Sequence, residues 1–226
     1  MNPGKGVLEF ESTAPDLPET VWPQLPARDD FTDAELAPVW NFLRTPRSDF
    51  WSLSEHPGFL RLRLKPERLS EIINPSYVGR RQQHLSFRAA ADMTFTPATE
   101  GEAAGIVLLQ NADWHFRYEL RLEAGEPVLQ LIERRGGSEQ LLASMPYSGD
   151  KVQLKVEAKG QDYSFSYRAS ESNKWNIMYG LADGRVLSTD LAGGFTGAYL
   201  GMYASSQGAD SANYADFDWF SYEGLE

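Results

Sequence analysis

The chain has 226 residues, no cysteine and a formal net charge of −11. This length can bury a sizeable core, and the absence of cysteine excludes disulfides, thiol catalysis and cysteine metal sites. So acidic a surface repels phosphate backbones, which excludes nucleic acid as an expected partner.

Residues 1–28 are predicted to form a leader outside the folded domain of residues 29–226. Pro15, Pro18, Pro23 and Pro26 favour an extended, polyproline-like strap, with a disordered tail as the alternative. The first residues lack the apolar segment of a signal peptide, and no run of about 18 apolar residues follows. We therefore expect no membrane insertion, and together with the lack of cysteine this favours a cytoplasmic location.

The remainder of the chain has the pattern of β-strands. Apolar and polar residues alternate over 85–95, 114–123, 152–156 and 163–167, and glycine-containing turns separate these runs. A spacing of roughly 8–12 residues between turns is typical of an all-β sandwich or barrel. One short helix is expected over 32–39, where Thr32 could act as its N-cap.

A polar segment precedes the first long strand. Arg80 and Arg81 offer two planar guanidinium groups, and Gln82 and Gln83 add two amides. These groups suit bidentate binding of a carboxylate or of sugar hydroxyls at the rim of the domain. The alternative is a hydrogen-bond network that only anchors loops.

Two segments close the chain. Residues 193–198 form a glycine-rich loop that is expected to present Phe195 with little around it. Residues 215–220 alternate acidic and aromatic side chains, which predicts a strand with one wet and one buried face. The Asp29-Asp30-Phe31 segment is the expected partner of this last strand.

Six segments, taken in order, resemble the C-terminal concanavalin A-like domain of family 43 β-xylosidases. The likeness runs from Pro26 to Tyr222 and implies a jelly-roll β-sandwich of two antiparallel sheets. The segments are Arg28-Asp29-Asp30-Phe31, Val39-Trp40-Asn41-Phe42-Leu43-Arg44, Val78-Gly79-Arg80-Arg81-Gln82-Gln83-His84, Glu100-Gly101-Glu102-Ala103-Ala104-Gly105, Gly193-Gly194-Phe195-Thr196-Gly197-Ala198 and Ala215-Asp216-Phe217-Asp218-Trp219-Phe220.

The resemblance implies an accessory role. Enzymes of that family hydrolyse β-1,4-xylosides with inversion, some also arabinofuranosides, and their catalytic carboxylates lie on a propeller domain that this sequence does not contain. No catalytic residue is therefore carried over. In the family the sandwich packs on the propeller and sends an aromatic loop toward the active-site mouth, a role that falls here to Phe195 and Thr196. The expected partner is such a propeller, and the leader resembles the linker to it.

The resemblance also suggests a structural calcium ion. Concanavalin A-like sandwiches often hold Ca²⁺ where the first and last strands meet, and Asp30 and Asp218 would supply hard oxygen ligands there. Asp29 and Asp216 are the adjacent alternatives. The competing interpretation is that these carboxylates are simply solvated or cap a turn.

Two rival functions remain. A freestanding carbohydrate-binding module would stack xylooligosaccharide rings on aromatics near turns, for which the candidates are Trp40, Trp51, Trp175 and Tyr179. An independent glycoside hydrolase is the weaker alternative, because no glutamate has an aspartate two residues later, as the Glu-x-Asp-x-x-Glu strand of sandwich glucanases requires. The three histidines share no metal-ligand spacing either.

Overall fold

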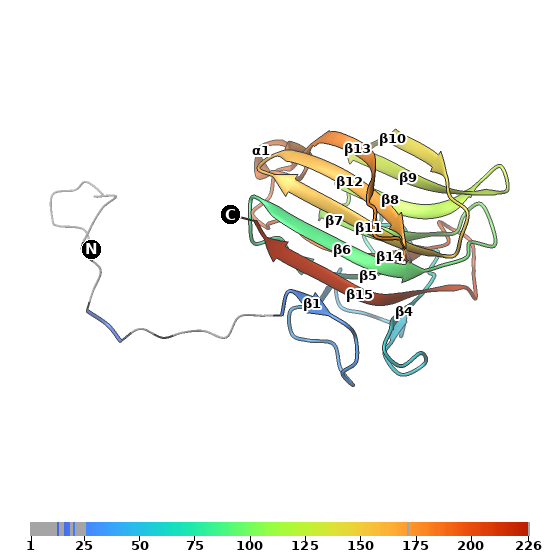
Figure 1. Cartoon of the computed structure of the whole chain (residues 1–226), viewed down its shortest axis with the longest axis horizontal. Helices are drawn as coiled ribbons and strands as arrows, with labels where there is room; N and C mark the ends of the chain where they lie inside the picture. Colours follow the sequence, from blue (N-terminus) through green and yellow to red (C-terminus); the bar gives the residue numbers. More distant parts are fainter. Residues whose placement is uncertain (1–12, 14–15, 19, 21–25, 171, 226) are drawn as a thin grey trace.

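The protein is a sandwich of two antiparallel β-sheets (Figure 1). The computed structural model describes residues 13, 16–18, 20, 26–170 and 172–225. The predicted leader therefore lies mostly outside the described residues. The expected fold class, an all-β sandwich of two antiparallel sheets, is confirmed.

One sheet has eight strands, in the order β13-β12-β11-β6-β15-β4-β3, with β1 paired to β15. The first and last described strands are neighbours in it, as predicted: Asp29 lies opposite Phe220. The strands are β1 (Arg28–Asp29), β3 (Trp51–Ser52), β4 (Leu60–Arg63), β6 (Phe87–Thr94), β11 (Lys151–Lys159), β12 (Asp162–Ala169), β13 (Asn176–Asp183) and β15 (Tyr214–Gly224).

The other sheet has seven strands, in the order β10-β9-β8-β7-β14-β5-β2. Its strands are β2 (Asn41–Phe42), β5 (Ser76–Arg81), β7 (Ala103–Asn111), β8 (Trp114–Glu123), β9 (Glu126–Arg135), β10 (Ser138–Pro146) and β14 (Tyr199–Ser205). Between β13 and β14 the chain forms a 3-10 turn, η1 (Gly184–Leu187), and a single-turn helix, α1 (Thr189–Ala192).

The core lies between the facing sides of the two sheets. Phe116 of β8 and Phe165 of β12 are both fully buried, and their ring centroids lie 5.7 Å apart. Burial of each such ring stabilises the fold by about 1.5–3 kcal/mol. The period-2 pattern that predicted β8 is confirmed on this side, since Phe116, Tyr118 and Leu120 all belong to the core.

The last strand departs from simple alternation. Ala215 and Phe217 point into the core, and then a register shift falls between Phe217 and Trp219. After this bulge Phe220 and Tyr222 take the core positions, and Trp219 lies outside the main core beneath the guanidinium of Arg28, 4.5 Å from it. A β-bulge reverses the faces of the residues that follow it, so strict alternation is wrong for this half of the strand.

The helix expected over 32–39 is not formed, and the prediction is wrong. These residues make bends and one turn, closed by a hydrogen bond from Trp40 N to Ala37 O. Trp40 is instead drawn into the core, where its ring lies edge-on to Phe220 at 5.3 Å and its Nε1 donates to Asp29 Oδ2 at 2.7 Å. Tertiary packing of the tryptophan outweighs the weak local preference for helix.

The polar face of β8 is buried and not exposed to solvent. His115, Arg117 and Glu119 alternate with the core residues, yet each is less than a tenth exposed. The connection between β4 and β5 packs on this outer face through Leu69, which joins a second, smaller apolar cluster with Val107, Leu109, Tyr77 and Tyr203.

Candidate functional site

Two segments that the sequence singled out lie side by side. In the antiparallel ladder of β5 and β14, Arg81 lies opposite Tyr199 and Arg80 opposite Leu200. The contact continues past the strands, because Gln82 N donates to Ala198 O at 2.9 Å. The polar segment 80–83 therefore adjoins the glycine-rich loop 193–198.

The loop presents its aromatic residue outward. Gly193 and Gly194 adopt φ values of +68° and +81°, which side chains rarely tolerate. Phe195, which follows these two glycines and precedes Thr196, is fully exposed, at 106% of its reference area. Phe195 therefore does not fill the core of its own sandwich, and the expectation that the loop presents it with little around it is confirmed.

Side-chain amides from β7 hold the loop. Gln110 Nε2 donates to Thr196 O at 2.8 Å, and Asn111 Nδ2 donates to Ala192 O at 3.3 Å. Main-chain oxygens that would otherwise face solvent are thus fixed to a central strand of the sheet. The loop offers its aromatic from a preorganised backbone.

A pocket of about 350 Å³ lies between the two segments. The described residues that line it include no aspartate, glutamate, lysine or arginine. Uncharged hydrogen-bonding groups line the pocket instead. Tyr163 OH donates to Gln82 Oε1 at 3.2 Å, whereas Oε1 of the buried Gln110 has no protein partner and can accept a hydrogen bond from a ligand. Gln82, Gln83, Gln110, Gln161, Thr189 and Thr196 provide the amides and hydroxyls.

The two arginines of the predicted rim do not act together. Arg80 points between the sheets, is only 6% exposed and lies over the ring of Tyr222 at 4.6 Å. Its burial lowers the guanidinium pKa from the ordinary arginine value, although the charges of Tyr222 and Asp29 oppose the shift. Arg81 is exposed and lies over Tyr199 at 4.8 Å. Of the predicted rim, Gln82 and Gln83 are the residues that reach the pocket.

The chain enters the sandwich beside this pocket. Tyr222 OH accepts hydrogen bonds from Gln83 N and His84 N at 2.8 and 3.1 Å, and Tyr222 N donates to Ala27 O at 2.7 Å. Figure 1 shows α1, the C-terminus and the start of β1 at one end of the molecule. We call this end, with the pocket and the 193–198 loop, the docking end.

Apolar side chains stand exposed around the same pocket. Leu85, which lines it, is 73% exposed, and Leu191 on α1 is 41% exposed. Together with Phe195, these two leucines lie around the polar pocket and form an interrupted apolar rim. A polar pocket bordered by exposed apolar side chains is typical of a surface that binds another protein.

The carboxylates proposed for calcium have protein partners instead. Asp30 accepts from Arg28 Nε at 2.6 Å, and Asp218 lies 3.5 Å from Lys151 Nζ. Asp29 accepts from Phe31 N and from the Trp40 indole. In the described part of the chain no three His, Asp or Glu residues gather as metal ligands would. The geometry of these carboxylates therefore does not support the calcium site expected from the sequence, and chelation, described in the Discussion, is the test of that expectation.

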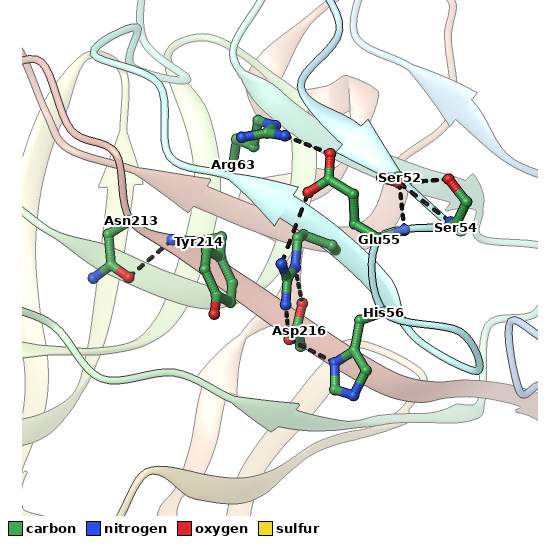
Figure 2. Close-up of polar contacts among 9 residues, drawn as sticks. Ser52, Ser54, Glu55, His56, Arg63, Asn213, Tyr214 and Asp216 are labelled. Atoms are coloured by element: carbon green, nitrogen blue, oxygen red, sulfur yellow. Dashed lines mark hydrogen bonds and ion pairs between the residues drawn. The ribbon is translucent and has the colours of Figure 1, made fainter.

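Asp216 forms a buried ion pair that ties the last strand to the β3–β4 connection (Figure 2). Arg61 binds both of its oxygens, each at 2.8 Å, and His56 Nδ1 lies 2.8 Å from Oδ2. Burial alone would raise the pKa of Asp216, but these hydrogen bonds outweigh it and the pKa is lowered. No sequence signal linked these residues, because about 155 positions separate Arg61 from Asp216.

A family model described as the beta xylosidase C-terminal Concanavalin A-like domain matches residues 28–223. The chain belongs to this family.

The relatives of this chain are longer proteins. The chain is 34% identical to a non-reducing end alpha-L-arabinofuranosidase of Bacteroides ovatus over 98% of its own length and 41% of the relative's. It is 35% identical to a xylosidase/arabinosidase of Butyrivibrio fibrisolvens over 99% of its length and 43% of that protein. The structure of a xylan beta-1,4-xylosidase from Bacillus halodurans superposes with a TM-score of 0.88 at 30% identity, over 94% of this chain and 42% of that one.

The chain thus spans about two fifths of the length of these relatives. It corresponds to an accessory C-terminal domain of such enzymes, as the resemblance implied. Among the described residues no helix is long and apolar enough to cross a membrane.

The four aromatic residues predicted to form a sugar-binding platform mostly pack against other side chains of the domain. Trp40 is buried in the core, and Trp51 stacks on Phe42 at 5.7 Å. Trp175 lies between Lys155 and Arg168, at 4.6 Å from each. Tyr179 is partly buried against the core. The prediction that Trp40 is available to stack on a sugar is wrong, because its ring is buried. Among the described residues, the aromatic side chain that is fully exposed is that of Phe195.

Proposed function

We propose that this domain docks onto a catalytic propeller domain of a glycoside hydrolase acting on xylosides or arabinofuranosides. Docking uses the docking end, so that Phe195 and Thr196 border the mouth of the partner's active site. There the aromatic side chain narrows the pocket and excludes water and longer substrates.

The exposure of Phe195 is the observation that supports this proposal most directly. A phenylalanine held in water forgoes about 1.5–3 kcal/mol of burial. Its loop is nevertheless fixed by Gln110, beside exposed Leu85 and Leu191 and beside the point where the chain enters the sandwich. A domain that precedes this one in the polypeptide would meet this end first.

Catalysis by the docking end alone is not expected. General acid and base catalysis of glycoside cleavage needs two carboxyl groups on either side of the bond. The described lining of the pocket offers amides and hydroxyls but no carboxylate. The acid and the base must therefore come from the partner.

Complementation in trans tests the proposal. The catalytic domain of a full-length relative, expressed separately, is assayed on nitrophenyl β-xyloside and on nitrophenyl α-arabinofuranoside with and without this chain. We expect no turnover by the chain alone, a rise in rate on mixing, and a weaker rise with Phe195→Ala. Leu141→Ala, which removes an exposed side chain on β10, is the matched control. Turnover by the chain alone, or equal rates for the two variants, would overturn the proposal.

A second candidate function is recognition of a neutral sugar by the same pocket. The uncharged, amide-rich lining and the unpartnered Gln110 Oε1 favour sugar hydroxyls as ligands. Titration with xylooligosaccharides by calorimetry tests it: saturable binding that Gln83→Ala weakens supports a carbohydrate-binding module. Absence of heat at millimolar sugar leaves docking as the function of this end.

A further inference from the structure

A second cleft lies on the outer face of the seven-stranded sheet and shares no lining residue with the pocket of the docking end. Its volume is about 300 Å³. Strands β8, β9 and β10 form its floor, and the β4–β5 and β14–β15 connections form its wall. We call it the basic cleft; its charged and polar lining includes Arg68, His115, Arg117, Arg134, Glu139 and Gln207.

The residues that line the basic cleft carry more positive than negative side chains, whereas the chain as a whole is acidic. Three arginines and one glutamate line it, although the chain carries a net charge of −11. Buried Glu119 lies 3.7 Å from Arg117, and Asp113 lies 3.5 Å from Arg134. The Arg68 guanidinium has no carboxylate within 4.0 Å among the described residues, and its Nη2 donates to Gln207 O at 2.7 Å; the carboxylate of Glu71 accepts from the Arg68 main-chain N instead, at 2.8 Å.

Two buried donors of the cleft lack acceptors. Arg117 Nε and Gln207 Nε2 have no hydrogen-bond partner, and the Arg117 side chain is only 8% exposed. An unsatisfied buried polar group costs about 1–3 kcal/mol. Both atoms are N–H donors, so an oxygen or another acceptor would complete them. Beside Arg117, Glu119 Oε2 and Tyr203 OH are also buried without a hydrogen-bond partner.

His115 adds an acceptor beside these donors. Its Nδ1 lies 3.2 Å from the carbonyl oxygen of Asn111, which can only accept, so Nδ1 carries the proton. Burial, reinforced by the charges of Arg117 and Arg134, lowers the His115 pKa to about 3 despite the opposing Asn111 hydrogen bond. The ring is therefore neutral at physiological pH, and Nε2 can accept from a hydroxyl group.

A carboxylate of the protein already shows how an anion would bind. Glu139 Oε2 accepts from Arg117 Nη2 at 2.9 Å, and its Oε1 lies 3.4 Å from Arg134 Nη1. Glu139 belongs to the edge strand β10, and its side chain is 42% exposed. It can swing into solvent and leave both guanidinium groups to an external carboxylate.

We propose that the basic cleft binds a small hydroxylated carboxylate of the uronic-acid type. Its carboxylate replaces that of Glu139 between Arg117 and Arg134, and Arg68 and Gln207 donate from the opposite wall. Its hydroxyls bond to His115 Nε2. The volume lies at the small end of ligand sites, which suits one sugar residue. This site is independent of the docking proposed above.

Calorimetric titration of the whole chain at low ionic strength tests the proposal with three probes: D-glucuronate, D-xylose and inorganic phosphate. Xylose has the same ring as glucuronate without the carboxylate, so it isolates the contribution of that group. We expect saturable binding of glucuronate that added salt weakens, and none of xylose. Phosphate bound as tightly as glucuronate would overturn the sugar-acid assignment, and no binding of any probe would overturn the site.

Two surface variants locate the binding. Arg68→Gln removes a guanidinium with no carboxylate partner, and we expect glucuronate affinity to fall about tenfold, the loss of one charge-assisted hydrogen bond. Glu139→Gln removes the competing carboxylate, so affinity should rise. Arg185→Gln, at an exposed arginine paired with Asp183, is the matched control. If all three variants bind like the unaltered chain, the ligand does not occupy this cleft.

Discussion

The side-chain amide of Gln110 on β7 donates a 2.8 Å hydrogen bond to the main-chain oxygen of Thr196, next to the fully exposed Phe195. Through this bond a central strand fixes the backbone of a surface loop. The orientation of the aromatic side chain is thus set by the sandwich and not by the loop alone.

Gln110→Ala should free this loop. One buried hydrogen bond contributes about 0.5–1.5 kcal/mol, so the melting temperature should fall by about 2–4 °C. Amide hydrogen exchange should accelerate most over residues 193–197. Gln140→Ala, at an exposed position on β10, is the control and should change neither quantity. Unchanged exchange in the loop of Gln110→Ala would show that the glycine backbone alone sets its conformation.

Two phenylalanines should respond oppositely to truncation. Phe195→Ala removes a ring that touches little of its own domain, so the free energy of unfolding should stay within about 0.5 kcal/mol. Phe217→Ala empties a fully buried core position and should cost about 3–5 kcal/mol. Urea unfolding measures both. A large loss for Phe195→Ala would mean that the loop packs against its own sandwich.

Much of the fold was accessible from sequence because period-2 patterning is local. The alternation in β8 predicted a strand with Phe116 and Tyr118 inside, and the structure places them there. What the pattern could not show is what covers the other face. His115 and Arg117 have the sequence pattern of a solvated surface, yet Leu69 from a connection some 45 residues earlier packs on that face.

The candidate site was predicted in part for the same reason. Glycines around Phe195 predicted an exposed aromatic, since that signal is contained in six consecutive residues. Gln110 gave no signal, because it is one polar residue near the end of an apolar strand. Its role depends on the β7–β14 pairing, which brings residues 86 positions apart into contact. The bulge at Asp218 likewise depends on the register with β6.

Gly201 should tolerate no side chain. A Cβ there would lie 2.4 Å from Val78 O and 2.6 Å from the Cα of Gly79 on the neighbouring strand. Gly201→Ala should therefore destabilise the fold by about 1–3 kcal/mol through overpacking. Gly197→Ala is the contrast, because its Cβ would meet only the Arg81 guanidinium at 3.8 Å. Equal melting temperatures for the two variants would contradict this account of the β5–β14 contact.

Chelation tests calcium binding. Because Arg28 and Lys151 already neutralise Asp30 and Asp218, we expect EDTA to leave the melting temperature unchanged. Added Ca²⁺ should not raise it either, since a ligand stabilises only the state that binds it. A fall with EDTA that Ca²⁺ but not Mg²⁺ reverses would instead support the sequence-based prediction.

The ion pair of Asp216 should make stability depend on acid pH. Its pKa is lowered in the folded protein, although burial acts in the opposite direction, because Arg61 and His56 donate to the ionised carboxylate. A lowered pKa means that the unfolded chain binds the proton more readily than the folded one. The stabilisation is therefore present above the ordinary aspartate value of 3.8 and is lost as the pH falls through the lower folded value.

Asp216→Asn removes this dependence while keeping the shape of the side chain. Its deficit in unfolding free energy, measured by urea denaturation, should be largest near neutral pH and should shrink below pH 3.8. Asp210→Asn, at an exposed position, should show no deficit at any pH. A deficit for Asp216→Asn that stays constant from neutral to acid pH would mean that the carboxylate acts through packing and not through its charge.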